Sequence, residues 1–255
     1  MWRKARIVVL LFILATVAQT AWLARTRSVE WQEPLRVAIY PIVADGSTQT
    51  GAYVDALRLT QFSGIETFFA DEARRHGLAL MKPVEIMLAP RVNSVPPAPP
   101  RNAGAFDAIV WTLSMRWWAW RNDELRGPKP QVRMFVLYFD PGLHPRLAHS
   151  VGVPQGLIGR VNAFADAEMT PTNNVIIAHE LLHTLGATDK YDAATSQPVH
   201  PEGYAEPQAA PLHPQRFAEL MGGRIPLSPQ RAEIPESLAQ VMVGTATARE
   251  IKWLR

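Results

Sequence analysis

The sequence predicts an α+β fold in which a single domain follows an N-terminal hydrophobic helix, and three observations favour this class. Runs with the composition of β-strands lie before residue 165, one well-bounded helical segment follows at 170–186, and prolines are frequent after residue 190. We therefore expect a mixed, mostly N-terminal β-sheet, a helix that carries the chemistry, and a loop-rich C-terminal part, together forming one domain over residues 31–255.

Four apolar runs predict strands because they are rich in β-branched and aromatic residues. They cover residues 35–43, 84–89, 132–139 and 157–164. Apolar residues at helical spacing predict a further helix at 65–76, which Gly77 would end. The run VPPAPP at 95–100 contains too much proline for a helix or a strand. After residue 190 we expect loops and short helices instead of a second sheet.

Residues 109–117 alternate between large apolar and smaller or polar side chains, which is the period of a strand. The polar link at 121–130 then favours an antiparallel pairing with the run at 132–139. Tryptophans are concentrated here, and we interpret them as core residues; a membrane-contacting surface is the alternative. These tryptophans are Trp111, Trp117, Trp118 and Trp120.

The charge distribution gives no indication of a nucleic-acid partner. The formal net charge is +3, from 26 basic and 23 acidic residues, but five of the basic residues precede residue 28. The rest of the chain therefore has 21 basic against 23 acidic residues, which is not a basic surface. Cysteine is absent, so disulfides and thiolate metal sites are excluded, and a metal would need His, Asp or Glu ligands.

Residues 7–24 form an apolar run between two basic clusters, close to the length that spans a bilayer. We interpret residues 1–30 as a signal anchor with a link, in contact with the membrane through residues 7–24. A cleaved signal peptide, and hence a secreted protein, is the alternative, because Ala18 and Ala21 suit a cleavage site. The basic residues before the run favour a cytoplasmic N-terminus and an exported domain, periplasmic or extracellular.

The helix predicted at 170–186 contains the run HELLHTLGATD from His179 to Asp189. Thr170 can cap this helix, Pro171 suits its first turn, and Gly186 can end it. His179 and His183 are four residues apart and project from one face, so both imidazoles can reach one metal ion. Glu180 would lie beside that metal and accept a proton from water.

Asp189 follows the expected turn at Gly186 and is the expected third metal ligand. A glutamate further along the chain, as in thermolysin-like enzymes, is the alternative, although the prolines around Glu202 and Glu206 disfavour the helix that it would need. The competing ligands after the motif are Asp192, His200, Glu202, Glu206 and His213.

The pattern His179-Glu180-x-x-His183-x-x-Gly186-x-x-Asp189 resembles the metzincin clan of zinc peptidases, in the snapalysin-like variant where aspartate replaces the third histidine. Met221, followed by two glycines, is similar to the methionine-containing turn beneath the zinc in that clan. The resemblance covers residues 170–223. It implies a zincin-like catalytic domain with Zn²⁺ held by His179, His183 and Asp189. It also implies that an extended substrate adds to the sheet edge along the strand at 160–165.

The sequence therefore predicts a zinc metalloendopeptidase that acts on proteins or peptides, with Glu180 as general base toward a zinc-activated water. A zinc amidase acting on cell-wall or other non-protein substrates is one alternative. A catalytically silent, zinc-stabilised binding domain is another, but Glu180 disfavours it because a structural zinc site needs no base. Tyr191 and Tyr204 are candidate oxyanion donors, and the sequence does not predict the oligomeric state.

Overall fold

The computed structural model describes residue 6 and residues 30–100, 104–153 and 157–254 of the 255-residue chain. The predicted membrane segment at 7–24 lies outside this part. Among the helices that the structure describes, none is long and apolar enough to cross a bilayer.

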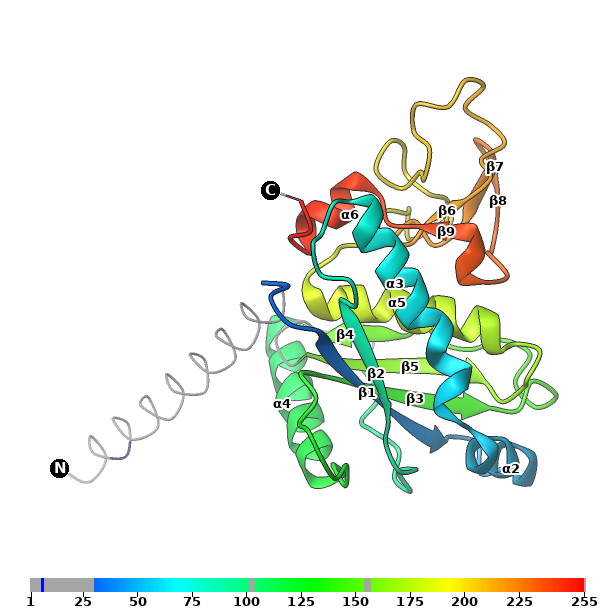
Figure 1. The fold of residues 1–255 in the computed structure, drawn as a ribbon. Coiled ribbons are helices and arrows are strands. Elements are labelled where there is room, and N and C mark those ends of the chain that lie inside the picture. The colour runs from blue at the N-terminus through cyan, green and yellow to red at the C-terminus, as the bar shows by residue number, and fades with distance from the viewer. Residues whose placement is uncertain (1–5, 7–29, 101–103, 154–156, 255) are drawn as a thin grey trace.

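A five-stranded mixed sheet forms the centre of the molecule (Figure 1). Its order is β2-β1-β3-β5-β4; the first four of these strands are parallel, and β4 is antiparallel to β5. The four predicted strands are confirmed within one residue, whereas β4 was not predicted. The strands are β1 (Leu35–Val43), β2 (Val84–Leu88), β3 (Val132–Phe139), β4 (Val151–Val153) and β5 (Ile158–Phe164).

Side chains alternate across the sheet and so define two separate cores. Val37 and Ile39 of β1 belong to a large cluster that includes residues of α3 (Ser63–Arg75) and α5 (Thr170–Leu185). Ala38 and Tyr40 belong to a smaller cluster that includes residues of α4 (Ala105–Arg121). Helices α3 and α5 therefore cover one face of the sheet, and α4 covers the other. Two short elements, α2 (Thr48–Ala56) and η1 (Leu59–Phe62), connect β1 to α3.

The strand predicted at 109–117 and its antiparallel pairing are both wrong. These residues belong to α4, and β3 pairs in parallel with β1 and β5. Six of the nine residues of this segment are apolar, and they are spaced so that a period of two and a helical period both fit it. Gly104 and Asp107 begin the helix: the Asp107 carboxylate accepts the Gly104 N–H at 3.2 Å, and this cap signal was missed.

The interpretation of the tryptophans as core residues is wrong for two of them. Trp118 is buried, and its ring meets that of Phe135 at a centroid distance of 4.9 Å. The side chains of Trp117 and Trp120 point away from the sheet, with 58% and 75% of their surface exposed.

The C-terminal part is rich in loops, as expected, but the expectation that it forms no further sheet is wrong, because it contains two small sheets. One pairs β6 (Ala218–Glu219) with β9 (Val241–Met242), and the other pairs β7 (Ile225–Ser228) with β8 (Arg231–Glu233). The remaining elements are η3 (Leu238–Gln240) and α6 (Thr245–Glu250). The run at 95–100 has no regular structure, as predicted. The described chain is thus a mixed αβ domain with one central sheet.

Candidate metal centre

Helix α5 has the predicted boundaries, and its end determines where the chain goes next. It runs from Thr170 to Leu185 with Met169, not Thr170, at the capping position and Pro171 in its first turn. Gly186 then adopts a left-handed conformation with φ 105°, which suits glycine because it has no Cβ. This turn brings Asp189 back toward the helix face that carries the two histidines.

The two imidazoles of α5 face each other with their Nε2 atoms 3.0 Å apart. Nδ1 of His179 is 2.8 Å from the carbonyl oxygen of Leu220, and Nδ1 of His183 is 2.9 Å from that of Ala187. Because a carbonyl only accepts, each Nδ1 carries the proton and donates it. In the neutral rings, both Nε2 lone pairs are then directed at the same place, as two ligands of one metal ion are.

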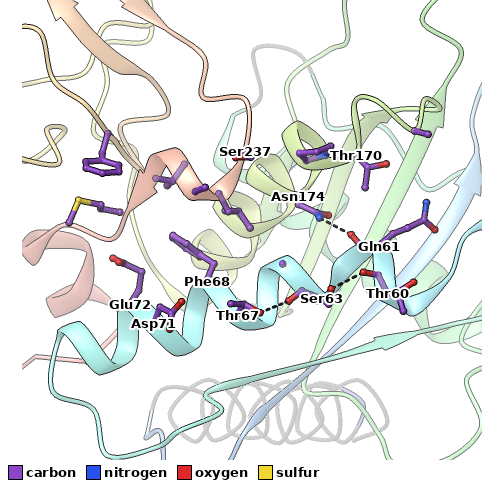
Figure 2. Close-up of a pocket in the computed structure, with 18 residues that line it drawn as sticks. Thr60, Gln61, Ser63, Thr67, Phe68, Asp71, Glu72, Thr170, Asn174 and Ser237 are labelled. Atoms are coloured by element: carbon purple, nitrogen blue, oxygen red, sulfur yellow. Dashed lines mark hydrogen bonds between the residues drawn. The ribbon is translucent and has the colours of Figure 1, made fainter.

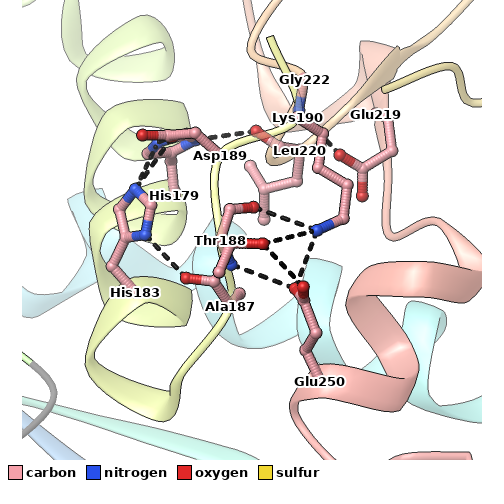
Figure 3. Close-up of polar contacts among 10 residues, drawn as sticks. All are labelled: His179, His183, Ala187, Thr188, Asp189, Lys190, Glu219, Leu220, Gly222 and Glu250. Carbon is pink, nitrogen blue, oxygen red and sulfur yellow. Dashed lines mark hydrogen bonds and ion pairs between the residues drawn. The ribbon is translucent and has the colours of Figure 1, made fainter. Parts of the chain in front are cut away.

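The Asp189 carboxylate lies close to both Nε2 atoms. Its Oδ1 is 3.2 Å from Nε2 of His179 and 3.1 Å from Nε2 of His183 (Figure 3). Burial lowers the pKa of His179, but the hydrogen bond that a protonated Nε2 would donate to Asp189, together with the charge of Glu180, outweighs this effect and raises the pKa. Burial raises the pKa of Asp189, but the contacts with the two histidines hold it well below its usual range. Asp189 is therefore ionised beside the two ring nitrogens.

Glu180 adds a buried carboxylate to this group. Its side chain is only 5% exposed, and burial raises its pKa. Within the described part of the chain, its Oε2 atom has no hydrogen-bond partner. A buried polar atom without a partner is costly unless a bound water molecule or ion satisfies it. The ligand atoms of His179, Glu180 and His183 lie within 4.8 Å of one another, so this group is positioned to bind a metal ion.

A partly buried ion pair holds the segment that carries Asp189. Nζ of Lys190 lies 2.9 Å from Oε2 of Glu250 on α6, and Glu250 also accepts the backbone N–H of Thr188 at 3.0 Å (Figure 3). The backbone N–H of Lys190 donates to the carbonyl of Met221 at 2.9 Å. The residues on both sides of Asp189 are therefore fixed to α6 and to the turn around Met221. Sequence reasoning missed this support, because nothing near the motif points to a residue sixty positions away.

Glu219 holds the turn that accepts the His179 proton, and it too was missed. It is fully buried, and its carboxylate accepts hydrogen bonds from the N–H groups of Gly222 and Gly244 and from the Thr247 hydroxyl. Burial raises the pKa of Glu219. This network fixes the backbone on either side of the Leu220 carbonyl, and hence the orientation of the His179 ring. Met221 follows directly and is fully buried.

Strand β4 lies directly against the two-histidine face. A Cβ atom on Gly152 would lie 2.5 Å from Cβ of His183 and 2.7 Å from the carbonyl oxygen of Glu180. Only glycine therefore allows this approach. Strand β5, expected to be the substrate-binding edge, is flanked by β3 and β4. That expectation is wrong: the edge of the sheet beside the site is β4.

The other candidate ligands contact different parts of the C-terminal region. The Glu206 carboxylate pairs with Arg216 at 3.1 Å, Asp192 accepts from the backbone of Thr195, and His213 contacts the Tyr204 hydroxyl. His200 contacts the carbonyl of Pro207, and Glu202 is exposed. The structure therefore brings Asp189 to the two histidines and places these alternatives elsewhere.

Two cavities are relevant to ligand binding. One, of about 330 Å³, adjoins the metal centre and is lined by His179, Glu180 and Tyr191 together with apolar residues, among them Leu147, Val175 and Ile176. A larger one, of about 1020 Å³, lies between α3, the start of α5 and η3 (Figure 2). The larger cavity is not lined by His179, Glu180, His183 or Asp189, so of these two cavities the first is better placed to hold a substrate at the metal centre.

Comparisons with known proteins give no family for this chain, so a functional assignment rests on the geometry of the site. No family model matches the chain, and a search of curated proteins finds no match.

Proposed function

We propose that this protein is a zinc-dependent metallopeptidase whose zinc ligands are His179, His183 and Asp189 and whose general base is Glu180. The observation that carries the proposal is the meeting of two Nε2 atoms and one carboxylate oxygen beside the buried Glu180, whose Oε2 has no hydrogen-bond partner among the described residues. Two imidazole nitrogens and one carboxylate oxygen are a ligand set that suits zinc. Three protein ligands leave the fourth coordination position open for water or substrate, as in catalytic zinc sites. A structural zinc site would have four protein ligands and no base.

The chemistry follows from the placement of Glu180. A zinc ion at this centre would polarise a substrate carbonyl and lower the pKa of a water molecule. Glu180 is one residue from the first ligand, and its raised pKa brings a buried carboxylate closer to the range in which it can take up a proton and release it again. It would accept a proton from the attacking water and return it to the leaving amine. Asp189 and the two backbone carbonyls keep the histidines oriented throughout.

The surroundings favour an extended peptide as substrate. Strand β4 is the last strand of the sheet, and no described strand pairs with its outer edge, so a peptide can add there by backbone hydrogen bonds. The cavity beside the centre is lined by Leu147, Ala148, His149 and Ser150, which lead into β4. A chain bound along β4 would therefore place one side chain in this mostly apolar cavity and its scissile bond beside Glu180.

Tyr191 is the better placed of the two tyrosine candidates for oxyanion stabilisation. Its ring lies 6.4 Å from that of His179, and it lines the cavity. Burial, together with the charge of Asp189, raises the pKa of Tyr191 to about 12, so its hydroxyl stays protonated and can donate. Tyr204 contacts His213 instead.

Tyr191→Phe should lower kcat roughly 100-fold with little change in KM, because a donor to the oxyanion acts mainly in the transition state. Steady-state kinetics on one peptide substrate measure both constants. Tyr204→Phe is the matched control and should leave kcat unchanged. Equal kcat values for Tyr191→Phe and the unaltered chain would remove Tyr191 from the mechanism.

A peptide library incubated with the purified full-length chain tests the proposed function. We expect cleavage that a chelator abolishes and that added zinc restores. Cleavage of a cell-wall amide but of no peptide would instead support the amidase alternative. Bound zinc without hydrolysis of either substrate would show that the domain is catalytically silent.

A further inference from the structure

Helix α4 presents a continuous apolar stripe to its surroundings. Six large side chains on it are 49–75% exposed, half of the twelve exposed large hydrophobic side chains found in the described residues. At 100° per residue they fall within one sector about 100° wide. They are Phe106, Ile109, Val110, Leu113, Trp117 and Trp120.

The opposite side of the same helix explains why the stripe is not part of a core. Met115, Trp118 and Ala119 are buried in the smaller cluster against β1 and β3. The helix is thus attached to the sheet by one face while its apolar outer face has no partner among the described elements. An exposed apolar face of this kind marks a surface for a protein or a membrane.

The composition of the stripe and its borders favours lipid. Tryptophan at its C-terminal end is typical of side chains at the level of lipid headgroups. Arg116 and Arg121 fall on the two sides of the stripe in helical projection, and the Arg121 guanidinium lies 5.5 Å from the centroid of the Trp117 ring. Asp107 is the only acidic residue of α4 and lies in its first turn. A basic border suits anionic headgroups.

The chain length before β1 also favours lipid. The predicted membrane segment ends at residue 24, and Trp31 is already buried, with its indole N–H bonded to the carbonyl of Ile251 at 2.7 Å. Six residues lie between residue 24 and Trp31, a tether of at most about 25 Å. A domain held so close to a bilayer can rest one face on it.

A second copy of the chain fits the stripe less well. A helix of seventeen residues is about 25 Å long, and a stripe roughly 10 Å wide then offers about 250 Å². A stable interface buries about 800 Å² on each partner. The stripe alone is too small for a stable dimer, whereas a bilayer sets no such minimum.

We propose that the outer face of α4 lies in the headgroup region of the membrane that holds the chain. The helix would lie parallel to the bilayer plane, with its six apolar side chains inserted and its arginines at the headgroups. Because α4 and α5 cover opposite faces of the sheet, the sheet would separate the membrane from the metal centre. The substrate cavity would then be accessible from the aqueous side.

Spin labelling of the full-length chain tests this placement, and the absence of cysteine makes single labels unambiguous. Leu113→Cys and Ile109→Cys place a label in the stripe, and Thr67→Cys, exposed on α3 across the sheet, is the matched control. The chain is reconstituted in vesicles of phosphatidylcholine and phosphatidylglycerol. We expect the ratio of collision rates with oxygen and with a water-soluble nickel complex to be several-fold higher at the stripe than at position 67.

Two results would overturn the proposal. Equal ratios at all three positions would mean that the stripe faces water. Protection of the stripe labels from both oxygen and nickel would mean that protein covers it, either a second copy or another segment of this chain. Thermal unfolding shows whether each variant folds. If one of the two stripe variants does not fold, the other still tests the proposal.

Discussion

Glu180→Gln should lower the hydrolytic rate by about a thousandfold while the chain keeps its zinc. A general base contributes roughly 10²- to 10⁴-fold, and an amide of the same shape cannot accept the proton. Stability should not fall. Burial raises the pKa of Glu180, which means that the site disfavours the charged form, and glutamine removes that charge without leaving a cavity.

Three measurements on the variant show whether Glu180 is the general base or a zinc ligand. They are kcat on a cleaved peptide, zinc per chain by elemental analysis, and the midpoint of thermal unfolding. Glu206→Gln, whose carboxylate pairs with Arg216, is the control and should match the unaltered chain in kcat and zinc content. Hydrolysis retained in Glu180→Gln would refute the mechanism. Simultaneous loss of zinc and activity would instead make Glu180 a ligand.

The strands were predictable because their signal is local. β1 and β3 lie in the middle of a parallel sheet, where both faces are covered, and such strands appear in the sequence as continuous apolar runs. The same reasoning failed for α4, since one of its faces is buried and the other is apolar although exposed. Periodicity identifies an element by the contrast between its two faces, and α4 has little contrast to detect.

The metal centre, like the fold, was predictable from the sequence only where its signal is local. The spacing of His179 and His183 fixes their common face on any helix, and Gly186 marks the turn that brings Asp189 back. The Leu220 carbonyl and the supporting residues Glu219 and Glu250 come from segments at least thirty residues after the helix. Their roles depend on tertiary packing, which no local pattern records. Gly152 shows the same limit, because its need for glycine arises only when β4 meets α5.

Asp189→Ala should weaken zinc binding by more than about 100-fold. Loss of a residue that only supports a ligand costs 10- to 100-fold in affinity, and loss of a ligand should cost more. The carboxylate oxygen lies 3.2 and 3.1 Å from the Nε2 atoms of the two rings, where it can share one metal ion with them, so its removal leaves two imidazoles to hold the metal alone. At a fixed zinc concentration, each tenfold loss of affinity removes about 1.4 kcal/mol of zinc-dependent stability.

Glu206→Ala is the decisive comparison, because Glu206 is the alternative third ligand suggested by the sequence. Its carboxylate pairs with Arg216 in the C-terminal region, so this variant should keep its zinc and its zinc-dependent rise in unfolding temperature. Asp189→Asn, which keeps an oxygen but loses the charge, should fall between Asp189→Ala and the unaltered chain. Normal zinc content in Asp189→Ala together with loss in Glu206→Ala would assign the third ligand to Glu206. That result would also require the C-terminal loops to move onto the centre when metal binds, because the ligand position is now taken by Asp189.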